Sequence, residues 1–192
     1  MDLAGITRAA KQDLLDPWFR TDQPPVLLAA GRLHPQKDYP TLLRAFARVR
    51  SDREVRLVIL GEGDERPRLE ALTRKLALTD HVRLPGYQKN PYAYMARAAA
   101  FILSSRWEGF PNVLLEALAC GCSVISTDCP NGPSELLAGG HFGRLVPVGD
   151  EVALERAILA SLDAPPDKMR QRRRAEEFAV DTIAEEYLQL VA

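Results

Sequence analysis

The sequence predicts an α/β protein with a doubly wound, mostly parallel sheet, helices on both faces of the sheet and a helical extension at the C-terminus. Short apolar runs alternate with helical patterns about six times along the chain. The runs are apolar at successive positions rather than at every second one. Continuous apolar runs are typical of parallel strands that helices bury on both faces.

The strands are predicted from apolar runs that end in glycine, proline or a polar loop. Glycine and proline interrupt regular structure, so they indicate where a strand stops. In a doubly wound, Rossmann-like sheet the ligand binds beyond the carboxyl ends of the strands, so the loops that follow the strands form the candidate site. The expected strands are 26–30, 56–60, 82–84, 100–103, 123–127 and 144–146.

The helices are predicted from apolar residues at helical spacing and from residues that suit a first turn. Pro40 is compatible with a helix that begins near Tyr39, and Asp150 is placed to cap another. Pro165 and Pro166 then break the chain before the helical extension. The expected helices begin near 39 and span 67–76, 91–98, 112–120, 134–138, 151–162 and the segment from 167 to 192.

Composition indicates a soluble globular protein of one ordinary domain. Hydrophobic residues make up 46% of the 192 residues and charged residues 27%. Lysine plus arginine (25) nearly balances aspartate plus glutamate (26), so the protein has no net positive charge that would attract it to nucleic acid. No apolar run approaches the length of about 18 residues that spans a bilayer, and no hydrophobic signal region is present at the N-terminus.

Cysteine usage and domain organisation complete this outline. The three cysteines lack metal-ligand spacing, and an odd number suits a reducing compartment, so we expect small buried thiols and a cytoplasmic protein. Residues 1–23 show weak periodicity and are interpreted as a linker or the remnant of a missing upstream domain. Residues 24–192 then form the domain that carries the motifs.

The loop after the first expected strand carries two cations five residues apart, Arg32 and Lys37. Gly31 lets the backbone approach a ligand closely, Arg32 offers a planar fork for phosphate oxygens, and Lys37 offers a mobile point charge. The alternative is a solvated loop with ordinary surface cations, because most lysines and arginines are exposed.

The segment 105–120 places a carboxylate in an otherwise apolar helix. Residues 113–120 are apolar on every side except at Glu116, which predicts a buried helix and a carboxylate that needs a partner or a ligand. Glu108 lies in the preceding loop, and the helix start between the two acids exposes unpaired N–H groups that suit a phosphate. The alternative is that Glu116 pairs with a buried arginine and Glu108 caps a loop.

Residues 128–135 place a second helix start after a strand. Glu135 lies near this start, where a carboxylate interacts favourably with the helix dipole. A ligand contact from Glu135 is an equally open interpretation.

In this order, the motifs resemble those of the large retaining group-1 family of GT-B glycosyltransferases. The resemblance rests on Gly-Arg-Leu with a following lysine (31–37), Gly-Glu-Gly (61–63), two glutamates separated by seven residues (108 and 116), and the stretches 128–137 and 143–150. It covers about residue 25 to the C-terminus. It implies transfer of a hexose from a nucleoside-diphosphate sugar, with UDP or GDP as the nucleotide, to an acceptor hydroxyl with retention at the anomeric carbon.

The resemblance also implies roles for individual residues. Arg32 and Lys37 would neutralise the diphosphate leaving group, Glu108 would contact hydroxyls of the donor sugar, and Glu116 would hold the ribose. The loop that contains Tyr87 would border the base. The implied donor-binding residues are Gly31, Tyr87, Gly109, Phe110, Pro111, Asn112, Val113, Leu114 and Glu116, and the further candidates are Gly61, Glu62, Gly63 and Glu135.

No metal or other cofactor is expected. The sequence contains no Asp-any-Asp pair that would hold a metal-bound diphosphate. Members of the family carry an upstream domain that binds the acceptor, and no segment of this chain corresponds to it. The chain is therefore expected to be the donor-binding half of an enzyme and inactive by itself.

Two further features concern partners. The cations between Lys168 and Arg174 are interpreted as a solvated helix face, the alternative being weak association with a membrane surface or an anionic acceptor. An apolar stripe within 183–191 would be exposed in an isolated half and would support a dimer. The competing functions are a non-catalytic module that binds a nucleotide or a partner, and another nucleotide-sugar enzyme of the same fold, such as an epimerase or a phosphorylase.

Overall fold

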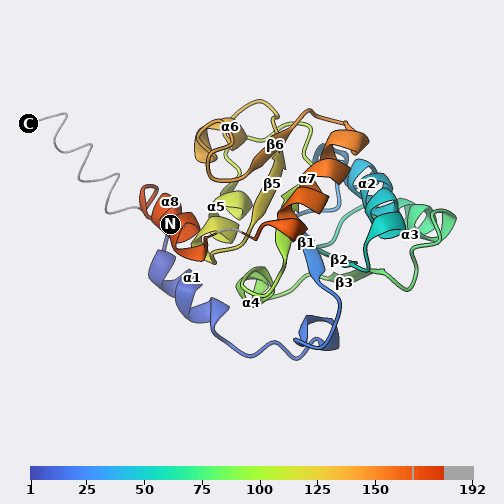
Figure 1. Ribbon diagram of the computed structural model, residues 1–192, viewed down its shortest axis with the longest axis horizontal. Coiled ribbons are helices and arrows are strands. Elements are labelled where there is room, and N and C mark those ends of the chain that lie inside the picture. The colour runs from blue at the N-terminus through green and yellow to red at the C-terminus, as the bar shows by residue number, and fades with distance from the viewer. Residues whose placement is uncertain (166, 180–192) are drawn as a thin grey trace, which may run out of the picture.

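The computed structural model describes residues 1–165 and 167–179, which contain a six-stranded parallel sheet. The strand order is β3-β2-β1-β4-β5-β6, so the chain winds outward from β1 in both directions (Figure 1). The predicted doubly wound α/β fold is therefore confirmed. The strands are β1 (Val26–Ala30), β2 (Arg56–Leu60), β3 (Val82–Gly86), β4 (Ala100–Leu103), β5 (Val124–Thr127) and β6 (Arg144–Val146).

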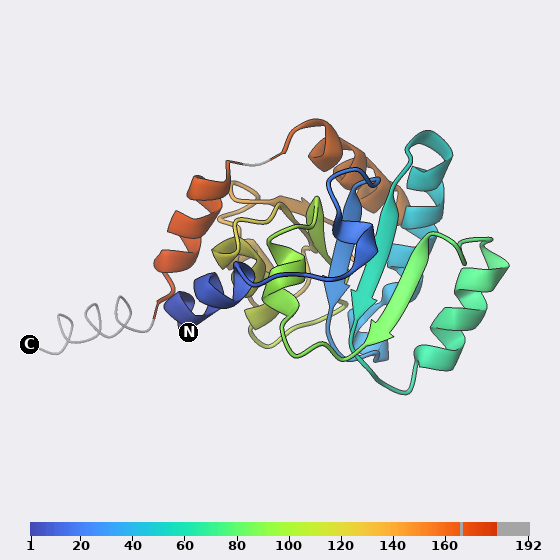
Figure 2. The ribbon, with the colours of Figure 1, turned by 90° about the horizontal axis from the view of Figure 1, so that it is seen from below.

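Helices cover both faces of the sheet, and the residues of each strand alternate between two apolar cores. Leu28 and Phe101 belong to the core beneath α1, α4, α5, α6 and α8, whereas Leu27 and Ile102 belong to the core beneath α2, α3 and α7. Helices α3 and α8 lie at opposite ends of the molecule (Figures 1 and 2). The helices are α1 (Leu3–Ala10), η1 (Pro17–Phe19), η2 (Pro35–Lys37), α2 (Tyr39–Asp52), α3 (Arg66–Lys75), α4 (Pro91–Met95), α5 (Asn112–Ala119), α6 (Pro133–Leu136), α7 (Glu151–Asp163) and α8 (Lys168–Glu176).

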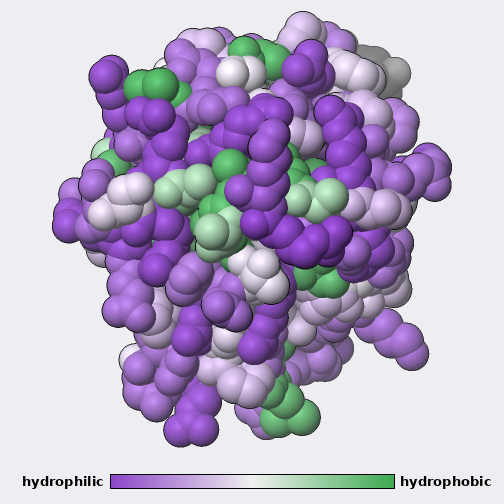
Figure 3. Space-filling view, turned by 90° about the vertical axis from the view of Figure 1, so that its right-hand side faces the viewer, coloured by the Kyte–Doolittle hydropathy of each residue, from purple (hydrophilic) through white to green (hydrophobic). Residues whose placement is uncertain are grey.

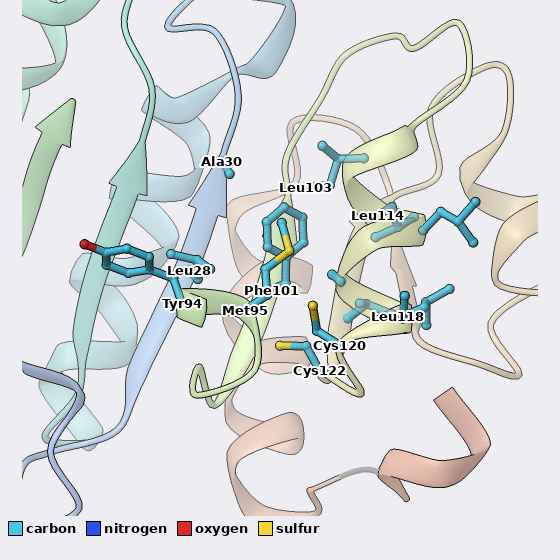
Figure 4. Packing of buried hydrophobic residues seen from close by; sticks show 14 of the residues in the cluster. Leu28, Ala30, Tyr94, Met95, Phe101, Leu103, Leu114, Leu118, Cys120 and Cys122 are labelled. Atoms are coloured by element: carbon cyan, nitrogen blue, oxygen red, sulfur yellow. The ribbon is translucent and has the colours of Figure 1, made fainter. Parts of the chain in front are cut away.

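Helix α5 is buried between the sheet and its neighbouring helices, as its apolar sequence predicts. Leu114 and Leu118 are fully buried and belong to the same cluster as Phe101 of β4 (Figure 4). Cys120 and Cys122 continue this core as free thiols, and burial raises the pKa of each to about 12. Both thiols therefore stay protonated and act as small apolar groups.

The N-terminal segment contains regular structure that the weak periodicity of residues 1–23 did not predict. Helix α1 packs against α4 and α5, and η1 buries the Trp18 ring. The guanidinium groups of Arg56 and Arg83 lie over this ring, 4.8 and 3.9 Å from its centroid. Tertiary contacts, which a short local pattern does not reveal, thus fix the segment to the rest of the chain.

Two of the cations between residues 168 and 174 make structural contacts. Arg174 donates hydrogen bonds to two main-chain carbonyls of α6, and Arg170 donates one to the carbonyl of His141. The solvated-face interpretation is therefore only partly right, because these side chains hold α8 against the α6 region. The expected helix over 180–192, its apolar stripe and the dimer it would support lie outside the described residues.

The molecular surface is largely polar. Figure 3 shows the face that carries α3, where hydrophilic residues dominate and hydrophobic residues form small patches. Within 1–165 and 167–179, no helix combines the length and apolar character needed to cross a bilayer.

Because α5 fills the core with leucines, Leu118→Ala is expected to reduce the free energy of unfolding by about 2–5 kcal/mol. Leu118 is 0% exposed, so the truncation leaves a cavity. Leu15→Ala is the matched control, since Leu15 is 92% exposed and its replacement should change stability by no more than about 0.5 kcal/mol. Urea unfolding of both variants measures the difference, and equal midpoints would contradict the assigned core.

Candidate functional site

Main-chain hydrogen bonds join the loops that follow β1, β2 and β3. The amide of Leu33 donates to the carbonyl of Glu62 (2.8 Å), and the amide of Gly61 donates to the carbonyl of Gly86 (2.9 Å). The Gly-Arg-Leu and Gly-Glu-Gly motifs, which are far apart in sequence, are therefore adjacent at the carboxyl edge of the sheet.

Two glycines of these loops are required by close approach of the main chain. A Cβ atom on Gly61, whose φ is +133°, would lie 2.0 Å from the carbonyl oxygen of Gly31. A Cβ on Gly63, with φ +158°, would lie 2.3 Å from the carbonyl oxygen of Leu33. Only glycine fits at either position, so loop packing alone explains these two members of the motif.

A pocket of about 350 Å³ opens between these loops and the start of α4. Arg32 is exposed at this pocket, and Tyr87 is 75% exposed. The carboxylate of Glu62 is held by the guanidinium of Arg66 at 2.8 and 2.9 Å, so Glu62 already has a partner. The lining residues are Ala30, Gly31, Arg32, Leu60, Gly61, Glu62, Tyr87, Gln88 and Pro91.

Beside this pocket, Lys37 and Glu108 form a buried ion pair. Lys37 Nζ lies 2.6 Å from Glu108 Oε1, and the side chains of Lys37 and Glu108 are only 15% and 7% exposed. Ser105 Oγ donates a second hydrogen bond to the same carboxylate oxygen. Glu108 Oε2 accepts no hydrogen bond from a described residue and is not fully buried. The pair thus leaves one carboxylate oxygen accessible for a further donor.

Further hydrogen bonds join the loops after β1 and β4. Ser104 Oγ donates to the carbonyl of Lys37 (2.6 Å), and the amide of Arg106 donates to the carbonyl of Gln36 (2.8 Å). Gln36 Nε2 returns a hydrogen bond to the carbonyl of Trp107 (2.8 Å). No sequence pattern indicates these contacts, although every residue involved lies in or next to one of the motifs.

Glu116 lies in a different environment from Glu108. The Tyr92 hydroxyl, in α4, donates to Glu116 Oε1 at 3.4 Å, and no cation pairs with Glu116 within the described chain. Burial raises the pKa of Glu116, and the hydrogen bond from Tyr92 opposes that rise. The alternative of a buried arginine partner for Glu116 is therefore wrong for the described residues.

The N-terminus of α5 lies open between the two acids. Pro111 occupies the N-cap position and provides no side-chain hydrogen bond to the first turn. Gly109, Phe110 and Asn112 are exposed around this helix start. The amides of Asn112 and Leu114 already donate to the carbonyls of Phe110 and Pro111 (both 2.9 Å), so the helix start offers an anion its partial positive charge and the Val113 amide.

Glu135 is exposed in the first turn of α6, as the helix-dipole interpretation predicts. The α6 start packs against the α5 start, because a Cβ on Gly132 would lie 2.4 Å from Pro111 Cδ. A ligand contact by Glu135 stays a prediction.

The structure thus gathers most of the predicted residues at one edge of the sheet. Arg32 and Lys37 both lie next to Gly31, since Arg32 and Gly31 line the same pocket and Lys37 Cε would lie 3.1 Å from a Cβ on Gly31. Glu108 pairs with Lys37, and Glu116 contacts α4, whose first residue lines the pocket.

Elsewhere in the described residues, the structure shows fewer features that indicate a binding or catalytic site. A pocket of about 380 Å³ between α3 and β3 contains none of the motif residues. No group of three histidine, cysteine, aspartate or glutamate side chains that could hold a metal ion occurs within 1–165 and 167–179. The carboxyl edge is therefore the candidate site.

Comparison with known proteins places the chain in a family. Residues 11–178 match the family described as glycosyl transferases group 1, and the chain belongs to this family. Its similarity to a glycosyltransferase was predicted from the motifs at residues 31–37, 61–63 and 108–116.

Relatives support the same class. The chain is 40% identical over 168 residues to an N-acetylgalactosaminyltransferase of Campylobacter jejuni that acts on a diphospho-undecaprenol-linked saccharide, covering 84% of this chain and 45% of the relative. The lipopolysaccharide outer core galactosyltransferase WaaB superposes with a TM-score of 0.81 at 27% identity, over 90% of this chain and 50% of WaaB. The pneumococcal O-GlcNAc transferase GtfA, in complex with UDP and GlcNAc, superposes with a TM-score of 0.75 at 25% identity, over 88% of this chain and 35% of GtfA. The chain therefore spans about half the length, or less, of these relatives.

Glu116→Gln should stabilise the protein more at neutral pH than at pH 4. Because the folded state raises the pKa of Glu116, the stability that this carboxyl contributes is present at low pH and is lost as the pH rises through its folded pKa. Glutamine keeps a neutral acceptor for Tyr92 and should remove this loss. Urea midpoints from pH 4 to 8 measure the effect, with the exposed Glu54→Gln as control; a constant difference between Glu116→Gln and wild type would contradict it.

Proposed function

We propose that this chain is the donor-binding half of a retaining glycosyltransferase that moves a hexose from a nucleoside-diphosphate sugar to an acceptor hydroxyl. The observation that best supports this proposal is the buried Lys37–Glu108 ion pair, which lies next to the start of α5, where no side chain caps the helix. This arrangement sets a cation, a carboxylate and a helix N-terminus at one edge of the sheet. A helix N-terminus and a cation favour a diphosphate, and a carboxylate can accept hydrogen bonds from the hydroxyls of its sugar.

The diphosphate would lie between Arg32, Lys37 and the positive end of the α5 dipole. Arg32 is free to reach it, because Arg32 is exposed and forms no ion pair with a described residue. Lys37 would exchange Glu108 for a phosphate oxygen or share its ammonium hydrogens between the two. In this proposal the main-chain groups from Gly109 to Leu114 cradle the phosphates and the sugar.

The two glutamates would each bind a different sugar of the donor, the transferred hexose or the ribose. Glu108 Oε2, the accessible oxygen, would accept a hydrogen bond from a hydroxyl of the transferred hexose. Glu116 would accept from the ribose hydroxyls, and Tyr87 would border the base. The pocket lined by Gly31, Gly61 and Gln88 would then receive the base, largely through main-chain groups.

In the transfer step, the bond between the anomeric carbon and the diphosphate oxygen breaks and a bond to the acceptor oxygen forms on the same face. The acceptor proton passes to the leaving phosphate oxygen. Negative charge grows on the diphosphate during this step, so Arg32, Lys37 and the α5 dipole stabilise the transition state more than the ground state. The proposal requires no metal.

The acceptor site would belong to a part of the enzyme beyond these 192 residues, because the chain spans about half of its relatives. The chain alone is therefore proposed to bind donor without transferring it. GtfA, whose structure contains UDP, supports a uridine nucleotide, and GDP remains the alternative for the panel below. Three free buried cysteines suit a cytoplasmic location, and Lys168 and Arg172 would add weak attraction to an anionic membrane surface.

A thermal-shift panel of UDP, GDP, ADP and their common sugar conjugates should show one nucleotide series that raises the midpoint of unfolding. A ligand that binds only the folded state adds about 2.7 kcal/mol at a hundred times its dissociation constant. Failure of every member to shift the midpoint would reject the proposed function and favour a module that binds a partner protein.

Lys37→Ala should weaken binding of the identified nucleoside diphosphate roughly ten- to a hundredfold, since a charge-assisted hydrogen bond contributes about 1.5–3 kcal/mol. It should also lower stability, because Glu108 then keeps a buried charge without its cation. Lys89→Ala is the matched control, an exposed lysine without an ion pair among the described residues. Calorimetry measures both affinities, and an unchanged affinity of folded Lys37→Ala would remove Lys37 from the site.

A further inference from the structure

The hydroxyl of Tyr39 is buried without a hydrogen-bond partner among the described residues. The side chain lies in the first position of α2, directly after the loop that carries Lys37, and the residue is 3% exposed. Buried polar groups in native proteins are nearly always paired, because an unpaired one keeps the full cost of losing water. An unpaired hydroxyl beside a binding site therefore requires an explanation.

This hydroxyl lies against the same point of the β1 loop as Lys37. A Cβ on Gly31 would lie 3.1 Å from the Tyr39 oxygen and 3.1 Å from Lys37 Cε. The Tyr39 oxygen and the Lys37 side chain thus both lie next to Gly31, and Lys37 is the residue that pairs with Glu108. Burial, and then the negative charge of Glu108, raise the pKa of Tyr39, so the phenol stays a neutral donor.

Two donors to Glu108 are in place within the described residues. Glu108 Oε1 accepts from Lys37 and from Ser105. A diphosphate that attracts the Lys37 ammonium would weaken this pairing and leave Glu108 Oε1 without its cation, with Ser105 as its remaining donor. Such a carboxylate needs a replacement, because an uncompensated buried charge is strongly unfavourable.

We propose that Tyr39 is a positioning residue for the donor complex, whose hydroxyl donates to the Glu108 carboxylate when the diphosphate engages Lys37. This inference rests on the proposed function and names a residue that the motifs do not contain. The hydroxyl is unpaired in the free state and paired in the bound state. A hydrogen bond strengthens ligand binding only if it is formed in the complex and absent from the free protein. The Tyr39 hydroxyl would meet this condition, so its new hydrogen bond would stabilise the donor complex.

Tyr39→Phe tests the proposal through two effects of opposite direction. The free protein should unfold at the same or a higher temperature, because phenylalanine keeps the ring and removes only the unpaired hydroxyl. Affinity for the nucleoside-diphosphate sugar found in the thermal-shift panel should fall roughly tenfold, the equivalent of about 1.4 kcal/mol. Thermal unfolding without ligand and calorimetry with the same ligand provide the two measurements.

Thr73→Val is the matched control, since it removes a buried hydroxyl that is paired with the Leu69 carbonyl (2.8 Å). It should lower stability and leave the affinity unchanged, because Thr73 lies in α3, outside the donor site. A combined Tyr39→Phe and Glu108→Gln variant should show coupling between the two positions in donor affinity but none in the stability of the free protein.

The possible outcomes distinguish a failure of the role of Tyr39 from a failure of the proposed function. Unchanged donor affinity of Tyr39→Phe, with wild type binding normally, would overturn the role of Tyr39 and leave the proposed function in place. A loss of stability that accompanies the loss of affinity would also overturn it, since a structural hydroxyl behaves in that way. Absence of binding by wild type would overturn the proposed function and this inference with it.

Discussion

Lys37 and Glu108 lie 71 residues apart in sequence, and their ion pair is almost wholly removed from water. A cation and an anion in such a position are tolerated only while each compensates the other, and the loss of one partner is strongly destabilising. The pair therefore fixes the loop after β1 relative to the loop after β4, together with the hydrogen bonds from Ser104 and Gln36. Arg32, Lys37 and Glu108 all lie in these two loops, and the start of α5 follows the second of them directly.

The sheet topology explains why such distant residues meet. Strands β1 and β4 are neighbours although β2 and β3 separate them in sequence, because the chain leaves β1 towards one edge of the sheet and returns to build the other half. The reversal opens a crevice at the carboxyl ends of β1 and β4. On the other side of β1, glycines allow the main chains of the loops after β1 and β2 to touch, so Gly61 matters for the position of Gly31 as well as for its own turn.

Much of this arrangement could be predicted from the sequence. Apolar runs located the strands, the apolar surroundings of Glu116 identified a buried helix, and the family's motifs selected Lys37 and Glu108. The contact between Lys37 and Glu108 could not be predicted, because it depends on the relative placement of two loops. A role for Tyr39 could not be predicted either. An aromatic residue at the start of a helix usually belongs to the core, and only the coordinates show that its hydroxyl lacks a hydrogen-bond partner. The weak periodicity of residues 1–23 likewise gave no sign of the packing around Trp18.

Helix α5 belongs to the hydrophobic core along most of its length and to the candidate site at its first turn and at Glu116. Its packing and the position of its first turn therefore cannot change independently. A substitution at Leu114 that displaced the helix by a fraction of an ångström would also move the amides at its start. If the proposed function holds, the buried leucine side chains of this helix would affect donor recognition indirectly, because their packing fixes where the helix start lies.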